Sequence, residues 1–170
     1  MVIAIGAAAF LAGASPVLSQ AAAPMFGAFT ADTDDPIAIE AQALVQTDRD
    51  GQRILEYSGG VVATRGDMVI RADALTVFLP ADGGAAGGAF QRIEATGNVT
   101  IVAGQQSAAA QRAVVDMVAQ TVVMNGAVSV QDGPNRLSGQ TLTVNLATND
   151  WRLEDGGNQR VQTVITPPAR

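Results

Sequence analysis

A short glycine-centred segment recurs in this chain and limits what the chain can fold into. Residues 55–66 read LEYSGGVVATRG, residues 93–104 read IEATGNVTIVAG, residues 122–133 read VVMNGAVSVQDG, and a shorter copy, RLEDGG, begins at Arg152. Apolar residues alternate around the central glycine of each full copy, as they do in a strand with one buried face. The repetition predicts that one strand motif is reused along the chain.

A second motif lies between these segments and predicts strands that bend. It reads IEAQAL at residues 39–44, IRADAL at 70–75 and LSGQTL at 137–142, with a degraded copy, AAAQRA, at 108–113. Ile70 and Ala72 share one face of an extended strand, whereas Leu75 and Val77 lie on the other. The strand keeps both pairs buried only if it bulges between them, near residues 73–74. We therefore expect strands that turn a corner and contribute to two facing sheets.

The spacing of the motifs predicts a repeat architecture made of strands. The central glycines, Gly59, Gly97, Gly126 and Gly156, recur at intervals of about 30 to 40 residues. The longest interval contains a Gly/Ala run, residues 81–89, which we interpret as an enlarged hairpin loop. Turn residues at 50–51, 132–135 and 149–150 separate the other strands. The sequence thus predicts an all-β chain, either a filled β-solenoid or an open β-jelly-roll of stacked antiparallel strands.

The interior is expected to consist of small and aliphatic side chains. Hydrophobic residues make up 48% of the chain but aromatic residues only 4%. Small residues that face each other across sheets roughly 10 Å apart leave room for a ligand, unless the two sheets approach more closely. The sequence is compatible with either arrangement. The alanines that we assign to inward positions are Ala41, Ala63, Ala72, Ala95, Ala110 and Ala113.

The composition argues against an enzyme. The chain has no Cys and no His, which excludes thiol catalysis, disulfides and the commonest metal ligands, so we expect no cofactor and no metal. Its net charge is −6, and no basic run suggests a nucleic-acid partner. Carboxylates recur beside arginines, at Asp67, Asp73, Glu94 and Asp116. This pattern fits a solvated sheet surface better than the facing acid pair of a carbohydrate-cleaving enzyme.

The N-terminus resembles a targeting segment. An apolar run at residues 2–14 precedes small residues, which is typical of a secretory signal peptide, here residues 1–23, with an uncleaved membrane anchor as the alternative. Residues 24–36 have no periodicity and are expected to be a flexible lead-in. The β domain is predicted at residues 37–166, followed by a tail at 167–170.

The phrases IRADALTVFL, RIEATGNVTIV and LSGQTLTVNL, in this order, resemble the OstA-like repeat of the LptA family of lipopolysaccharide-transport proteins. The resemblance covers residues 37–155, with departures at the degraded copy and the Gly/Ala run. It implies a periplasmic β-jelly-roll that holds lipid A acyl chains in an apolar groove and carries lipopolysaccharide from the inner to the outer membrane. The alternatives are a membrane-anchored LptC-like component and a structural β-solenoid without a lipid.

The resemblance also implies protein partners at the two edges of the sheet. These are an LptC-like inner-membrane partner at the N-terminal edge and an LptD-like outer-membrane partner at the C-terminal edge, with head-to-tail self-association as a further possibility. We expect unpaired edge strands at residues 37–45 and 161–165, because neither interior contains a proline that would prevent strand addition. The candidate partner contacts are Ile37, Ile39, Ala41, Val161 and Val164.

Alternating apolar residues of the repeats are the candidate lipid-binding positions. Plain core packing is the alternative interpretation for each of them. The candidate groove residues are Ile70, Leu75, Val77, Ile93, Val99, Ile101, Met124, Val128, Leu142 and Val144.

Overall fold

The protein is represented by a computed structural model that describes residues 36–80, 90–157 and 160–165. The expected signal peptide, most of the lead-in, the Gly/Ala run and the tail lie outside these residues. All regular structure within them is strand, so the described ranges contain no helix that could cross a membrane. The strands are β1 (Ala38–Glu40), β2 (Ala43–Arg49), β3 (Gln52–Arg65), β4 (Met68–Leu79), β5 (Arg92–Ala103), β6 (Gln106–Asp116), β7 (Thr121–Asp132), β8 (Asn135–Asn145), β9 (Trp151–Glu154) and β10 (Gln162–Val164).

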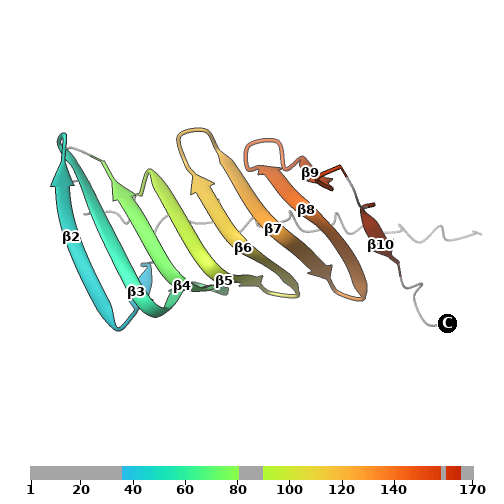
Figure 1. Cartoon of the computed structure of the whole chain (residues 1–170), viewed down its shortest axis with the longest axis horizontal. Coiled ribbons are helices and arrows are strands. Elements are labelled where there is room, and N and C mark those ends of the chain that lie inside the picture. The colour runs from blue at the N-terminus through green and yellow to red at the C-terminus, as the bar shows by residue number, and fades with distance from the viewer. Residues whose placement is uncertain (1–35, 81–89, 158–159, 166–170) are drawn as a thin grey trace, which may run out of the picture.

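The strands form one antiparallel, 10-stranded sheet that does not close on itself. Strands β3 to β8 pair in chain order, and short turns join them except between β4 and β5, where the connection contains the Gly/Ala run. Figure 1 shows them side by side along the long axis of the molecule. The prediction of an all-β, open jelly-roll is confirmed.

Each edge of the sheet consists of two short strands, which corrects the predicted single edge strands. At the N-terminal edge β1 and β2 both pair with β3, and the chain leaves the ladder at residues 41–42 between them. This edge extends to Arg49, beyond the predicted end at Val45. At the C-terminal edge β9 and β10 both pair with β8, so residues 161–165 supply only part of that edge.

The pairing register shifts at one position in every strand pair from β3–β4 to β7–β8. In the β4–β5 pair, for example, the shift lies between Arg71 and Ala74, where the sequence predicts a bulge. The shifted positions are neighbours across the sheet and form what we call the corner line, residues 59–60, 72–73, 97–98, 110–111, 126–127 and 140. The corner line lets one strand present its apolar side chains to the same interior on both sides of the bulge.

Glycines with left-handed backbone occupy the corner line of β3, β5 and β7. The φ angles are +88° at Gly59, +76° at Gly97 and +86° at Gly126, a region in which a Cβ is unfavourable. A polar side chain of the preceding strand or edge lies against each glycine: Gln42 on Gly59, Asp73 on Gly97 and Gln111 on Gly126. In the shorter copy of the repeat, Gln140 likewise approaches Gly156. The central glycines of the full copies therefore lie where the strands bend.

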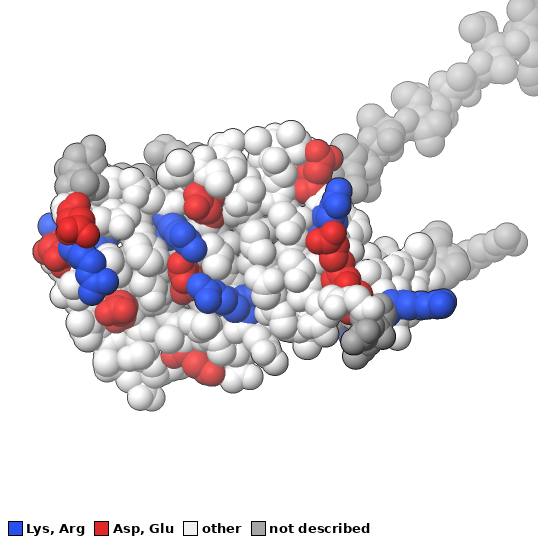
Figure 2. Space-filling model, turned by 45° about the horizontal axis from the view of Figure 1, so that its top comes forward, with Lys and Arg blue, Asp and Glu red and all other residues white. Residues whose placement is uncertain are grey.

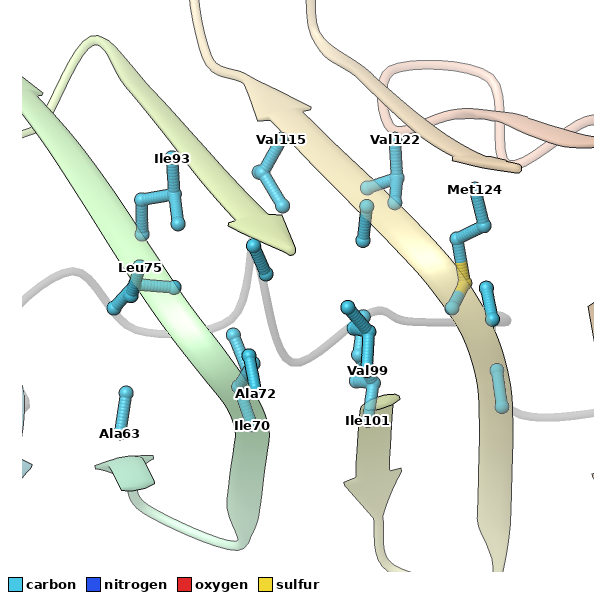
Figure 3. Packing of buried hydrophobic residues seen from close by; sticks show 14 of the residues in the cluster. Ala63, Ile70, Ala72, Leu75, Ile93, Val99, Ile101, Val115, Val122 and Met124 are labelled. Carbon is cyan, nitrogen blue, oxygen red and sulfur yellow. The ribbon is translucent and has the colours of Figure 1, made fainter. Parts of the chain in front are cut away.

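The corner line divides the sheet into two halves that cover each other. Half-sheet 1 contains β2, β9 and residues 52–58, 74–79, 92–96, 112–116, 121–125 and 141–145; half-sheet 2 contains β1, β10 and residues 61–65, 68–71, 99–103, 106–109, 128–132 and 135–139. The inward side chains of both halves belong to one buried cluster (Figure 3). The two facing sheets predicted from the sequence are therefore halves of one folded sheet.

A substitution at Gly97 tests the importance of the corner line. A Cβ at Gly97 would collide with the Asp73 carboxylate, whereas a Cβ at Gly104, in the β5–β6 turn at φ +58°, would meet no atom within 4 Å. Left-handed backbone alone costs a non-glycine residue of order 1–3 kcal/mol. We expect Gly97→Ala to lower the free energy of unfolding, measured by urea denaturation, clearly more than Gly104→Ala. Equal losses would show that crowding at the corner is unimportant.

Candidate functional site

The candidate groove residues are all brought together in the interior between the half-sheets. Every one of them is at most 6% exposed and belongs to the single buried cluster. Ile93, Met124 and Leu142 come from half-sheet 1, whereas Ile70 and Val99 come from half-sheet 2. Figure 3 shows side chains from both halves entering the same interior. The structure thus gathers these residues at one place, and their contact with lipid remains a prediction.

The strand register arranges the inward side chains in continuous rows across the sheet. In half-sheet 1, one row runs through Tyr57, Leu75, Ala95, Ala113, Met124, Leu142 and Leu153. A parallel row runs through Leu55, Val77, Ile93, Val115, Val122, Val144 and Trp151. Because each position is a direct cross-strand partner of the next, the apolar surface continues without a gap from one edge of the sheet to the other.

The interior contains residues that the candidate list missed. Val115, Val122 and Val130 are buried at 2% or less and lie in the same rows or in the facing half. Extending the alternation through Ala113 and Met124 would have identified the first two. Phe90 is also buried, at 8% exposed, but it follows the Gly/Ala run and no periodic signal marks it.

The two half-sheets pack closely against each other. The alanines assigned to inward positions are buried, with the exception of Ala41, which is exposed because it lies at the free N-terminal edge. Among the described residues, an apolar cavity between the halves, lined by Ile39, Ile70, Leu75 and Phe90 among others, has a volume of about 10 Å³. The larger hollows of about 250 and 240 Å³ lie on the outward faces, around Arg92 and Ser138 respectively. Over the residues that the structure describes, the small inward side chains are accommodated by close approach of the two half-sheets.

Each apolar row has an exposed apolar side chain at one edge of the sheet. Leu44 pairs with Tyr57 at the N-terminal edge and is 55% exposed, and Trp151 pairs with Val144 at the C-terminal edge and is 46% exposed. These two residues have no outer neighbour strand to cover them. The interior is therefore closed along its length but open to contact at its two ends.

The candidate edge contacts occupy different environments. Ile37 and Ile39 are half-buried and pack against the core, whereas Ala41 lies exposed between β1 and β2. Val161 is 42% exposed just before β10, and Val164, within β10, is 61% exposed. The C-terminal candidates are thus more accessible than Ile37 and Ile39.

Most charged side chains form small mixed groups on the outer surface, as Figure 2 illustrates for one face. Glu94 forms ion pairs with both Arg92 and Arg112. The Arg92 guanidinium also lies over the ring of Phe78. Arg65 differs from the expected solvated arginines, since it is only 8% exposed. Its position at the end of β3 directs it to the inward side, next to Met68 and Ile37. No cluster of acidic residues in the described ranges is suited to hold a metal ion.

The geometry defines the class of protein: an open β-jelly-roll whose apolar interior runs from edge to edge. Residues 38–150 match the family model described as the LptA/(LptD N-terminal domain) LPS transport protein. The chain belongs to this family and is a component of lipopolysaccharide transport.

Two relatives illustrate the similarity. The chain is 32% identical over 161 residues to an uncharacterized protein of Rhizobium meliloti (strain 1021), covering 92% of this chain and 85% of that protein. The fold is similar to the crystal structure of LptH, described as the LptA homologous periplasmic component of the lipopolysaccharide transport device of Pseudomonas aeruginosa. That match has a TM-score of 0.63 and 19% identity, and covers 80% of this chain and 99% of the other.

The same substitution at two leucines distinguishes the packed interior from the open end. Leu142 is fully buried, and Leu44 is 55% exposed at the edge of the same apolar surface. Leu142→Ala is expected to reduce the free energy of unfolding by about 2–5 kcal/mol, as in other packed cores. Leu44→Ala removes a half-exposed side chain and should cost less than about 1 kcal/mol. Thermal or urea denaturation measures both, and comparable losses would contradict the assignment of Leu44 to an open end.

Proposed function

We propose that this protein is a periplasmic carrier that holds lipid A acyl chains of lipopolysaccharide against its apolar interior and passes them from the inner to the outer membrane. The observation that carries this proposal is the unbroken apolar surface between the half-sheets, which ends in exposed Leu44 and Trp151. Membership of a lipopolysaccharide-transport family supplies the chemical class of the ligand.

The energetics of acyl chains explain why a carrier of this kind needs a continuous surface. At about 0.8 kcal/mol per CH₂, releasing a chain of about twelve carbons into water costs on the order of 10 kcal/mol. An apolar path that reaches both edges lets a chain move to the next protein without that exposure. Such a carrier needs no catalytic residue, so the proposal is that of a non-enzymatic component.

The periplasmic location is part of the proposal. It is supported by the similar fold of LptH, which is described as a periplasmic component, and by the signal-like sequence at residues 1–23. Mass spectrometry of the mature N-terminus separates the cleaved carrier from a membrane-anchored LptC-like component, in which those residues would be retained.

The edges of the sheet support a second part of the proposal, that partners add strands there. Glu40 and Ala43 pair with Val62 and Ser58 of β3, the same two residues that pair with Arg71 and Ala74 on the other side of β3. The N-terminal edge therefore keeps the register of an interior strand across the corner. This regular template suits an LptC-like partner or a second copy of this chain.

The C-terminal edge is less regular. On β8, Thr141 and Ser138 pair with Glu154 and Gln162 on the outer side but with Asn125 and Ser129 on the inner side. More residues therefore separate Glu154 from Gln162 on the outer side of β8 than separate Asn125 from Ser129 on the inner side. We assign this edge to the LptD-like partner or to the N-terminal edge of a second copy.

Site-specific photo-crosslinking tests the lipid ligand. A photoreactive residue at Val77, Ile101 or Val128 points into the interior, whereas one at Val102 lies on the outward side next to Ile101. In cells, lipopolysaccharide adducts are expected from the inward positions and few or none from Val102. Absence of adducts at every inward position would favour a structural β-solenoid with a permanently closed core.

Crosslinking at the edges tests the partners independently of lipid. A photoreactive residue at Leu44 or Val164 should give adducts with an Lpt partner or with a second copy of this chain. Val118, in the β6–β7 turn, is the control, because it is 78% exposed but belongs to no sheet edge. Adducts of equal yield at Val118 would indicate random collision and contradict strand addition.

A further inference from the structure

The interior between the half-sheets is closed, so the half-sheets must move if an acyl chain is to enter. The inference drawn from this rests on the proposed function. The candidate groove residues are at most 6% exposed, and the apolar cavity beside Ile70 and Leu75 holds about 10 Å³. That volume admits about one water molecule. An acyl chain therefore enters only if the two half-sheets separate.

The backbone hydrogen-bonding pattern shows where the two half-sheets can separate with the least loss of ladder hydrogen bonds. On either side of the corner line the strand ladders keep one register, so each half-sheet is a continuous unit. The register changes only at the corner line, at neighbouring positions in consecutive strand pairs. A change in angle there alters a single aligned row of residues, whereas bending elsewhere would break ladder bonds in several strands.

The residues at the corner line suit a change of angle. Gly59, Gly97 and Gly126 have left-handed backbone, and each is followed by another residue with positive φ, namely Gly60, Asn98 or Ala127. Glycine occupies this region and its surroundings with little steric restriction, so moderate changes of φ and ψ cost little.

Polar side chains restrain the corner in the arrangement seen here. The Asn98 side-chain amide donates a hydrogen bond of 3.0 Å to Asp73, and the Ala127 backbone N–H donates one of 3.3 Å to the Gln140 side chain. Asp73 also lies against Gly97. These contacts are exposed, so their loss exchanges a protein hydrogen bond for one to water at a modest cost.

The side opposite the corner line closes through side-chain contacts. The Gln52 amide donates to Gln91 within half-sheet 1, and the Gln106 amide donates to Asp132 within half-sheet 2. Neither bond crosses from one half to the other. Phe90 belongs to the buried cluster. Met117 and Leu146, from the turns of half-sheet 1, pack against this cluster. Apolar contacts of this kind can be exchanged for contacts with an acyl chain.

We propose that the corner line is a hinge about which the half-sheets open to admit an acyl chain, and that Asp73, by covering Gly97 and binding Asn98, restrains the hinge in its closed position.

Distances between spin labels measure this motion directly. The chain contains no cysteine, so introduced cysteines are the only labelling sites. Gln105 and Ala119 are exposed turn residues at opposite ends of β6, and the corner line lies between them. The control pair, Ala119 and Ala147, lies in two exposed turns of half-sheet 1. Without lipid, the pair across the hinge should show a broader distance distribution than the control pair.

A substitution at the corner line tests the role of Asp73 without any ligand. Asp73→Ala should broaden the distribution of the Gln105–Ala119 pair, whereas Asp67→Ala, the same change in the exposed β3–β4 turn, should leave it unchanged. Asp73→Asn keeps an oxygen that can accept from Asn98 and should restore a narrow distribution. Equal widths for both pairs, or no effect of Asp73→Ala, would overturn the hinge. If Asp73→Ala does not fold, Gln111→Ala, at the neighbouring Gly126, takes its place.

Addition of lipid A micelles separates this inference from the proposed function. Binding is followed independently by co-elution of lipid A with the protein in gel filtration. If lipid A binds and the Gln105–Ala119 distance lengthens while the control pair stays constant, the hinge is supported. If lipid A binds and neither distance changes, the hinge is wrong although the carrier function stands. If lipid A does not bind, the carrier function fails, and the measurements without lipid decide the hinge.

Discussion

The structure depends on one apolar sheet face, whose two halves cover each other. In the described ranges the chain forms strands and no helix, so the side chains that alternate inward are shielded from water only when one half of the sheet lies on the other. The corner line makes this possible, because its bulges turn apolar residues of both halves to the same side. Burial of Leu142 and Val128 in one cluster is a direct result.

Much of this arrangement could be predicted from local pattern. The spacing between Ile70 and Leu75 is odd, and two buried residues at odd spacing in one strand require a bulge between them. The turn residues between the strands favoured hairpin pairing of consecutive strands, and the recurring glycine-centred segments indicated that one strand motif is reused. These features are local, so a single repeat contains the information for them.

The features that escaped prediction depend on residues distant in sequence. Alanines such as Ala95 and Ala110 are compatible with a wide slot or with close packing, and the choice depends on how the facing half fits against them. The burial of Arg65 was not predicted, and Ile37, which lines the same cavity, comes from a distant part of the chain. The breaks in the edges arise because an edge strand has a neighbour on one side only, so a corner there is not bridged by a second ladder.

The open ends of the apolar rows give this protein an optical property. Trp151 is the only tryptophan of the chain and lies at the C-terminal end of the interior, 46% exposed. The intrinsic indole emission of the protein therefore originates from one edge of the sheet alone. Covering of that edge by any apolar group transfers the indole from water to a drier environment, whereas events at the N-terminal edge leave it unchanged. The unlabelled protein thus carries a spectroscopic marker that distinguishes its two ends.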